Sequence, residues 1–222
     1  MELELSGIPL RENLEELVYK AFKQSILSGK LAPGTRLIEE EIAKAMRVSK
    51  TPVRHALARL QSEGLVVAIP WQGKRVVSLT LEEVSQLYDV REALEGMAAR
   101  LAAGQLGEEV LAQMTAHVAD SERHLAQGDM EAFLVADRSW HDLLIRGSGN
   151  DLLAQMMEGV RNKILIMQVA SIYYGRRGQD SVAEHRSVLE ALYAHDSDAA
   201  EQRMRAHICN VRAIVLKTLA KN

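Results

Sequence analysis

Apolar positions in the first third of the chain recur with the spacing of short helices. Val53, Leu57 and Leu60 fall at i, i+4 and i+7, which places their side chains on one face of an α-helix. A shorter apolar series, Ile38 to Met46, precedes them, and a longer helical period extends over Leu10–Ser28. The pattern predicts three helices, of which the last two are joined by a tight turn.

Local signals mark the start of the third helix and the segment that follows it. Ser49 is the expected N-cap, because its hydroxyl can accept from a first-turn N–H, and Pro52 lies in that turn, where a missing N–H is tolerated. The β-rich runs Leu65–Pro70 and Lys74–Leu79 are separated by Trp71–Gly73, which predicts a hairpin with a glycine in its turn. Helices joined by a turn and followed by a hairpin predict a winged helix-turn-helix.

The rest of the chain has a helical pattern throughout. Thr80 and Glu83 have the spacing of a capping box, so a new helix should begin at Leu81. We therefore expect a mainly α protein, with a winged helix-turn-helix in residues 1–78 and an all-α antiparallel bundle in residues 79–222. A polar break is expected at residues 175–179. The six expected bundle helices are Leu81–Gly104, Glu108–Gln127, Met130–Arg146, Leu152–Tyr174, Asp180–His195 and Asp198–Ala220.

Charge is distributed unevenly between the two expected domains. The 222 residues carry a net charge of −3, yet residues 1–78 hold 12 cations and 9 acids, whereas residues 79–222 hold 15 cations and 21 acids. Between Lys44 and Arg75, seven cations accompany a single acid, Glu63. This basic block favours contact with the phosphates of DNA, although a solvated basic face on a helical hairpin would have the same composition.

Other features of the composition bear on where the protein works. The chain has no apolar run of 18 residues and no basic, apolar leader at its N-terminus, so we expect neither a membrane span nor a signal peptide. The single Cys209 excludes an internal disulfide and suits a reducing compartment. We therefore expect a cytoplasmic protein without a membrane partner.

The segment PGTRLIEEEIAKAMRVSKTPVRHALARLQSEGLV resembles the winged-helix signature of the GntR transcription regulators. It contains their Pro-Gly-x-x-Leu opening, Val-Ser-x-Thr-Pro-Val-Arg and the closing Leu-x-x-Glu-Gly-Leu. It departs from the family at Arg47, where a turn glycine is usual, at Lys50, where arginine is usual, and at His55, where glutamate is common. Arg47 would cost roughly 1 kcal/mol if its backbone is left-handed. Lys50 lacks the bidentate fork of arginine, which affects the preferred operator bases.

We expect this domain to bind double-stranded operator DNA. Lys50, Thr51 and Arg54 would read or brace the major groove. The remaining expected DNA contacts are phosphate contacts from Arg36, Ser49 and Arg59 and wing contacts from Gln72, Gly73 and Lys74.

Four residues able to bind a metal lie on apolar stripes of the bundle helices. Asp137 and His141 are four residues apart on one stripe, and His185 and His207 lie on the stripes of the last two helices. A buried, ionised Asp137 would be costly without a partner, and a divalent cation bound by all four would satisfy them. The alternative is a set of core histidines hydrogen-bonded to carbonyls or carboxylates. The histidines with ordinary roles are expected to be His55, His117, His124 and His195.

The C-terminal half resembles the all-helical ligand-binding domain of the FadR-like branch, in its metal-binding subset. The run from Tyr88 to Glu95, YDVREALE, resembles the opening motif of that domain, and Asp137-x-x-x-His141, Glu184-His185-Arg186 and His207 match the subset's ligand pattern. The resemblance implies that Arg91 faces an effector pocket and could clamp a carboxylate. A surface ion pair between Arg91 and Glu95 is the alternative.

Three imidazoles and one carboxylate suit Zn²⁺ best, with Ni²⁺ or a similar transition ion possible, and suit Ca²⁺ less well. The site could be a closed tetrahedral zinc site or a more open one that binds a carboxylate effector directly. We favour the open site because it gives the bundle a sensing role.

The sequence thus predicts a homodimeric, ligand-responsive transcription regulator that is not an enzyme. A direct metal sensor and a metal-dependent hydrolase are the alternatives, since such a site can activate water. Against the hydrolase, no spare carboxylate or histidine is expected on the same stripes to act as a base.

Overall fold

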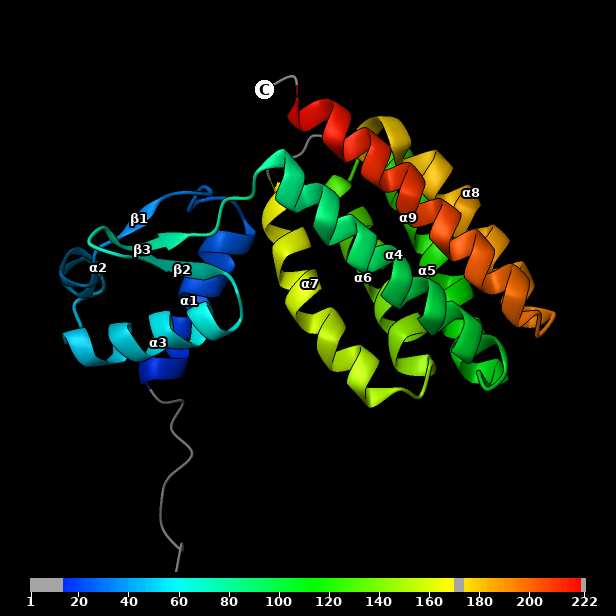
Figure 1. The fold of residues 1–222 in the computed structure, drawn as a ribbon, viewed down its shortest axis with the longest axis horizontal. Helices are drawn as coiled ribbons and strands as arrows, with labels where there is room; N and C mark the ends of the chain where they lie inside the picture. The colour runs from blue at the N-terminus through cyan, green and yellow to red at the C-terminus, as the bar shows by residue number, and fades with distance from the viewer. Residues whose placement is uncertain (1–13, 170–173, 221–222) are drawn as a thin grey trace, which may run out of the picture. The chain divides into compact units, whose positions relative to one another are not determined.

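The computed structural model describes residues 14–169 and 174–220, which form nine helices and a small three-stranded sheet (Figure 1). The prediction of a mainly α protein is therefore confirmed. The described residues divide into two compact units, one made of residues 14–78 with 162–169 and the other of residues 79–161 with 174–220. None of the described helices is long and apolar enough to cross a membrane.

The three expected helices of the first unit are present as α1 (Leu14–Leu27), α2 (Glu39–Met46) and α3 (Lys50–Ser62). The expected start of the first helix, at residues 10–13, lies outside the described residues. Val53, Leu57 and Leu60 are fully buried, as their spacing predicts. The α1 residues Val18, Tyr19, Phe22 and Ile26 belong to the same core, so this apolar stripe holds α3 against α1.

The turn between α2 and α3 depends on a strained residue. Arg47 ends α2 in the left-handed conformation, with φ 55° and ψ 43°, where the family usually has glycine. Ser49 occupies the N-cap position of α3, but its side chain makes no cap hydrogen bond, so that part of the prediction is wrong. The reason is Pro52, which lies at the third helical position and lacks the N–H that an N-cap hydroxyl commonly accepts from.

The predicted hairpin consists of β2 (Val66–Ile69) and β3 (Gly73–Val76), which pair antiparallel with Val66 opposite Val76. Trp71 and Gly73 in the connection both have positive φ, 64° and 85°. A two-residue strand, β1 (Arg36–Leu37), pairs with the other edge of β3 and gives the order β1-β3-β2. The sequence pattern did not indicate β1, because two residues are too few to show an alternation.

The six helices after the hairpin follow the predicted series closely. They are α4 (Leu81–Ala103), α5 (Glu108–Gln127), α6 (Met130–Gly147), α7 (Asp151–Val169), α8 (Tyr174–Tyr193) and α9 (Ser197–Leu219). Thr80 and Glu83 form the expected capping box, and Asp129 caps α6 through the Ala132 N–H. Helix α4 packs against α6, α8 and α9, and α5 packs against α6 and α8, which brings α6, α8 and α9 around one core (Figure 1).

One boundary prediction in this unit is wrong. The polar run at 175–179 was expected to break the chain, but it forms the first turns of α8. Two contacts hold these turns in the helix, and the first lies within α8: Arg177 is buried and makes a bidentate pair with Glu184, at 2.5 and 2.6 Å. Gly178 lies so close to Leu125 of α5 that an added Cβ would meet that side chain. The predicted end of the preceding helix, beyond Val169, lies outside the described residues as far as Tyr174, which begins α8.

Candidate functional site

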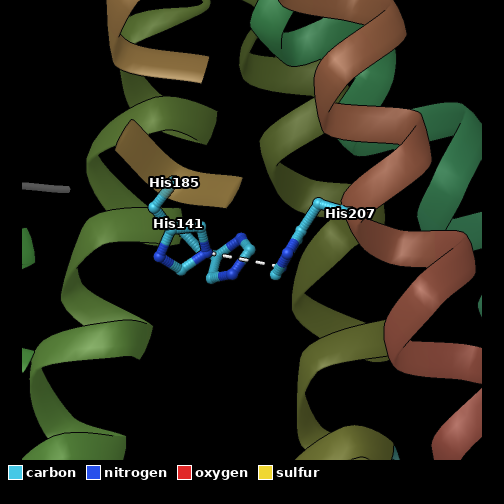
Figure 2. Close-up of side chains that lie close together, drawn as sticks. All are labelled: His141, His185 and His207. Carbon is cyan, nitrogen blue, oxygen red and sulfur yellow. Dashed lines mark hydrogen bonds between the residues drawn. The ribbon is translucent and has the colours of Figure 1, made fainter. Parts of the chain in front are cut away.

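Three buried imidazoles from three helices meet in the core of the second unit. His141 comes from α6, His185 from α8 and His207 from α9, and their side chains point toward one another (Figure 2). One potential ligand atom from each residue lies within 4.8 Å of those of the other two. Nε2 of His185 and Nε2 of His207 are 3.3 Å apart. The periodicity argument therefore selected three residues that the fold brings together.

Asp137 lies beside this group without being part of its compact centre. Its carboxylate is buried, and Oδ1 is 3.9 Å from Nε2 of His185. The same His185 nitrogen thus faces both the His207 ring and the Asp137 carboxylate. Asp137 is one helical turn before His141 on α6, as the sequence indicated, and it remains a candidate fourth ligand.

Burial keeps two of these imidazoles neutral. The pKa of His185 is far below its ordinary value, first because the ring is removed from water and then because His207 and His141 would repel a second positive charge. Burial also lowers the pKa of His207, although the Glu184 carboxylate acts in the opposite direction. A neutral imidazole has a lone pair, which is the form that binds a metal.

Two carboxylates that the sequence analysis did not select determine how the rings are protonated. The Nδ1–H of His141 donates to Glu95 at 2.5 Å, and the Nδ1–H of His207 donates to Glu184 at 2.6 Å. With Nδ1 engaged by a carboxylate, each of these two rings presents Nε2 on its other side. A carboxylate that fixes the tautomer of a histidine in this way is typical of metal sites. In both rings Nε2 is the nitrogen left to bind an ion.

Both carboxylates are themselves held by cations. Glu95 is 1% exposed and accepts from Nε of Arg91 at 2.5 Å. Burial disfavours its charge, yet Arg91 and His141 together hold the pKa of Glu95 well below its usual range. Glu184 accepts from Arg177 and, at 2.8 Å, from Asn210. With its His207 contact, these bonds lower the pKa of Glu184 against the effect of burial.

These contacts show how Arg91 is paired. Arg91 is 5% exposed and is paired with Glu95, so the ion pair exists, but it is buried rather than on the surface. The sequence analysis selected neither Glu95 nor Glu184, although Glu95 contacts His141 and Glu184 contacts His207. One sequence signal pointed to Glu95, namely its position one turn after Arg91 in YDVREALE.

The donor set fits a transition-metal ion. A tetrahedral Zn²⁺ with Zn–N bonds of about 2.0–2.1 Å separates two ligand nitrogens by roughly 3.3–3.4 Å. The 3.3 Å between the Nε2 atoms of His185 and His207 matches that separation. Neutral imidazoles suit Zn²⁺ or Ni²⁺, whereas Ca²⁺ prefers oxygen ligands. A direct hydrogen bond from His185 to His207 would account for the same distance, so geometry alone leaves both interpretations open.

The residues expected to contact DNA lie on the first unit, and most of them are exposed. Ser49, Lys50, Thr51 and Arg54 are all exposed around the first turns of α3. Arg36 is exposed on β1. On the wing, Gln72 and Gly73 are exposed, whereas Lys74 is partly buried; they lie beside Trp71, whose side chain is fully exposed.

Arg59 has a different environment from the other candidates. Nη1 of Arg59 donates to Glu16 of α1 at 2.6 Å, and its guanidinium carbon lies 3.6 Å from the centre of the Tyr19 ring. Glu63 accepts from the Tyr19 hydroxyl at 2.6 Å and from Lys23 at 2.7 Å. Arg59 therefore joins α3 to α1, and contact with a phosphate would require it to leave Glu16.

Comparison with known proteins assigns both units. Residues 14–76 match the model of the bacterial regulatory proteins of the gntR family, and residues 86–210 match the FCD domain. The chain belongs to the GntR family, with an FCD domain as its C-terminal part. The resemblance to GntR regulators with a FadR-like C-terminal domain is thereby confirmed, and membership of the metal-binding subset stays a prediction.

Similar proteins of this family are transcription regulators. Over 190 residues the GntR-family chain is 28% identical to the HTH-type transcriptional regulator YdhC of Bacillus subtilis, with 85% of each chain covered. It is 24% identical to the HTH-type transcriptional repressor RspR of Escherichia coli, covering 94% of this chain and 92% of RspR. The solved structure of E. coli McbR/YncC has the same fold, with a TM-score of 0.78, 24% identity and coverage of 94% of this chain and 100% of that one.

The GntR assignment makes this chain a DNA-binding transcription regulator. It accounts for the exposed cations on α3 and for the wing beside them, which an enzyme would not need. The three-histidine cluster lies in the part of the chain that matches the FCD domain, since His141, His185 and His207 all fall within residues 86–210.

Proposed function

We propose that this GntR-family regulator binds a divalent transition metal, most suitably Zn²⁺, in its FCD domain and changes its operator affinity when a small carboxylate effector binds there. Three buried, converging imidazoles, two of them held at Nδ1 by carboxylates, are the observation that carries this proposal. His141, His185 and His207 would hold the ion, with Asp137 as the fourth ligand.

The carboxylate class of the effector follows from the charges at the site. A divalent ion bound by three neutral rings and one carboxylate keeps a net positive charge, which favours an anionic ligand. Arg91 is a candidate second contact, reached by exchange of its Glu95 partner for the effector carboxylate. Ligand and DNA affinity would be coupled if the effector binds one arrangement of the helices more tightly than another.

The proposed regulator acts as a homodimer in the cytoplasm. One winged domain has little reach along DNA, and a two-fold protein matches a two-fold operator. Lys50, Thr51 and Arg54 would contact the major groove, and Gln72, Gly73 and Lys74 would position the wing. Ser49, Arg36 and Arg59 would contact phosphates, the last after release from Glu16.

Elemental analysis of the purified protein tests the metal site. After exposure to zinc and exhaustive dialysis, we expect about one metal ion per chain in the wild type. The variant D137A/H185A should hold none, whereas H117A, which changes a histidine on α5 outside the cluster, should retain the metal. Absence of metal from the wild type would refute the site whether or not the variants fold.

Melting curves with a panel of small carboxylates then test the effector. A ligand that stabilises the metal-loaded wild type, but not the protein stripped by a chelator, should also change its affinity for operator DNA. The effector part fails if a saturating stabilising ligand leaves operator affinity unchanged. Operator affinity that follows free metal alone would favour a direct metal sensor instead, and metal-dependent turnover of ester substrates would favour a hydrolase.

A further inference from the structure

Three cations expected to contact DNA are paired with carboxylates from the start of α2. Lys50 lies 3.1 Å from Glu40, Arg54 lies 3.3 Å from Glu39, and Lys74 lies 3.4 Å from Glu39. These acids are just upstream of the basic block that begins at Lys44, so a charge count over that block does not include them. The surface that meets DNA is therefore less positive than the sequence of α3 and the wing suggests.

Glu39 differs from Glu40 because its carboxylate contacts two structural elements. Oε2 accepts from Nε of Arg54 on α3, and Oε1 accepts from Nζ of Lys74 on β3. Its side chain is 29% exposed, whereas that of Glu40 is 75% exposed. One carboxylate thus joins the helix expected to enter the major groove to the strand that carries the wing.

The bridge that Glu39 forms between Arg54 and Lys74 should affect how tightly the protein binds DNA. Binding to DNA of any sequence depends on the cations available to phosphates, while recognition of an operator also needs side chains held in position for particular bases. A carboxylate next to Arg54 and Lys74 repels phosphates and competes for the same donors. It also restricts where these two side chains can lie, which favours one arrangement of the groove contacts.

We propose that Glu39 is a specificity-determining residue, which partly neutralises and positions Arg54 and Lys74 so that binding to random DNA is suppressed relative to the operator. The inference rests on the proposed DNA-binding role of these residues. A purely structural role is the alternative, because an acid in the first turn of a helix is favoured by the helix dipole. Glu41 shares that position and that charge in the first turn of α2 and serves as the matched control.

The test compares E39Q and E41Q with the wild type on two duplexes. One duplex is the sequence that the wild type enriches from a random pool, and the other is an unselected random sequence of equal length. For E39Q we expect affinity for the random duplex to rise roughly 3- to 10-fold at low salt, and its dependence on salt concentration to steepen by about one ion released. Affinity for the enriched duplex should rise less or fall, so the specificity ratio decreases.

E41Q should leave both affinities within about twofold of the wild type, and unchanged melting curves would show that both variants are folded. The inference is overturned if E39Q and E41Q raise affinity for random DNA equally, or if E39Q weakens binding to both duplexes by the same factor. If the wild type enriches no sequence, the proposed DNA recognition itself fails, and this inference fails with it.

Discussion

Replacement of Glu95 by glutamine is the sharpest test of the buried network around the histidines. Glu95 and Arg91 have side-chain exposures of 1% and 6%, and Glu95 also accepts from His141. Glutamine has nearly the same volume as glutamate, so no cavity forms. It has no charge, however, and only one acceptor atom, so E95Q removes the carboxylate with which the buried Arg91 pairs.

The expected loss of stability is large because the affected charge is buried. Removing one member of a buried ion pair destabilises a protein by about 3–5 kcal/mol. With about 2–4 °C per kcal/mol for a protein of this size, the melting temperature of the FCD domain should fall by roughly 10 °C. The double variant R91M/E95Q removes both charges and should recover at least half of the loss, so the two substitutions will not be additive.

The measurement is thermal and urea unfolding of chelator-treated protein, so that lost metal does not contribute to the difference. Because the pKa of Glu95 in the folded state lies below its unfolded value of about 4.3, its stabilisation is fully present above that value. It disappears only as the pH falls through the lower, folded pKa. Titration of Glu95 itself should therefore contribute no change to the difference between wild type and E95Q from pH 8 to pH 5. A loss below about 1 kcal/mol, or strictly additive effects, would refute a buried charge network.

Two further substitutions test the winged domain. R47G should raise its stability by about 1 kcal/mol, because the exposed Arg47 has a left-handed backbone that glycine adopts without strain; an unchanged or lower midpoint in urea would contradict this. E63Q should lower stability by roughly 1 kcal/mol at pH 7, since Glu63 accepts from Tyr19 and Lys23 but is partly exposed. Burial opposes the charge of Glu63, but these bonds outweigh it and lower its pKa, so its stabilisation is present above about pH 4.3 and is lost as the pH falls through the folded value. Melting curves of wild type and E63Q should accordingly differ at pH 7 and converge as the pH falls through the folded pKa of Glu63.

Periodicity predicted the helices because burial of one face repeats along the chain. The positions of α5 and α6, the Asp129 cap of α6 and the hairpin followed from local signals. The start of α8 did not, because its polar first turns are stabilised by one contact within α8 that apolar periodicity does not register and by another with a different helix. Arg177 needs Glu184 two turns later, and Gly178 needs Leu125 on another helix. The strand β1 was missed for a similar reason, since only its pairing with β3 defines it.

The candidate metal ligands could be predicted from helical periodicity, whereas the carboxylates that hold them could not. His141, His185 and His207 stand out because a histidine on an apolar stripe is unusual. Glutamates are common on helices, and apart from the position of Glu95 one turn after Arg91, nothing local distinguishes Glu95 or Glu184 from a solvated residue. Glu95 lies 46 positions from His141 in the sequence, so only the packing of α4 against α6 brings the two together.

The two proposed binding sites use the same physical arrangement. In each, a carboxylate holds the group that would meet the ligand: Glu95 and Glu184 hold imidazoles, and Glu39 holds Arg54 and Lys74. The consequences differ because burial differs. Around the histidines water is excluded, so the carboxylates fix a tautomer and their loss should reduce metal affinity by about 10- to 100-fold. On the DNA-binding surface the pairs are solvated and weak, so Glu39 can yield to a phosphate or a base, and its effect should appear in the ratio of two affinities rather than in folding.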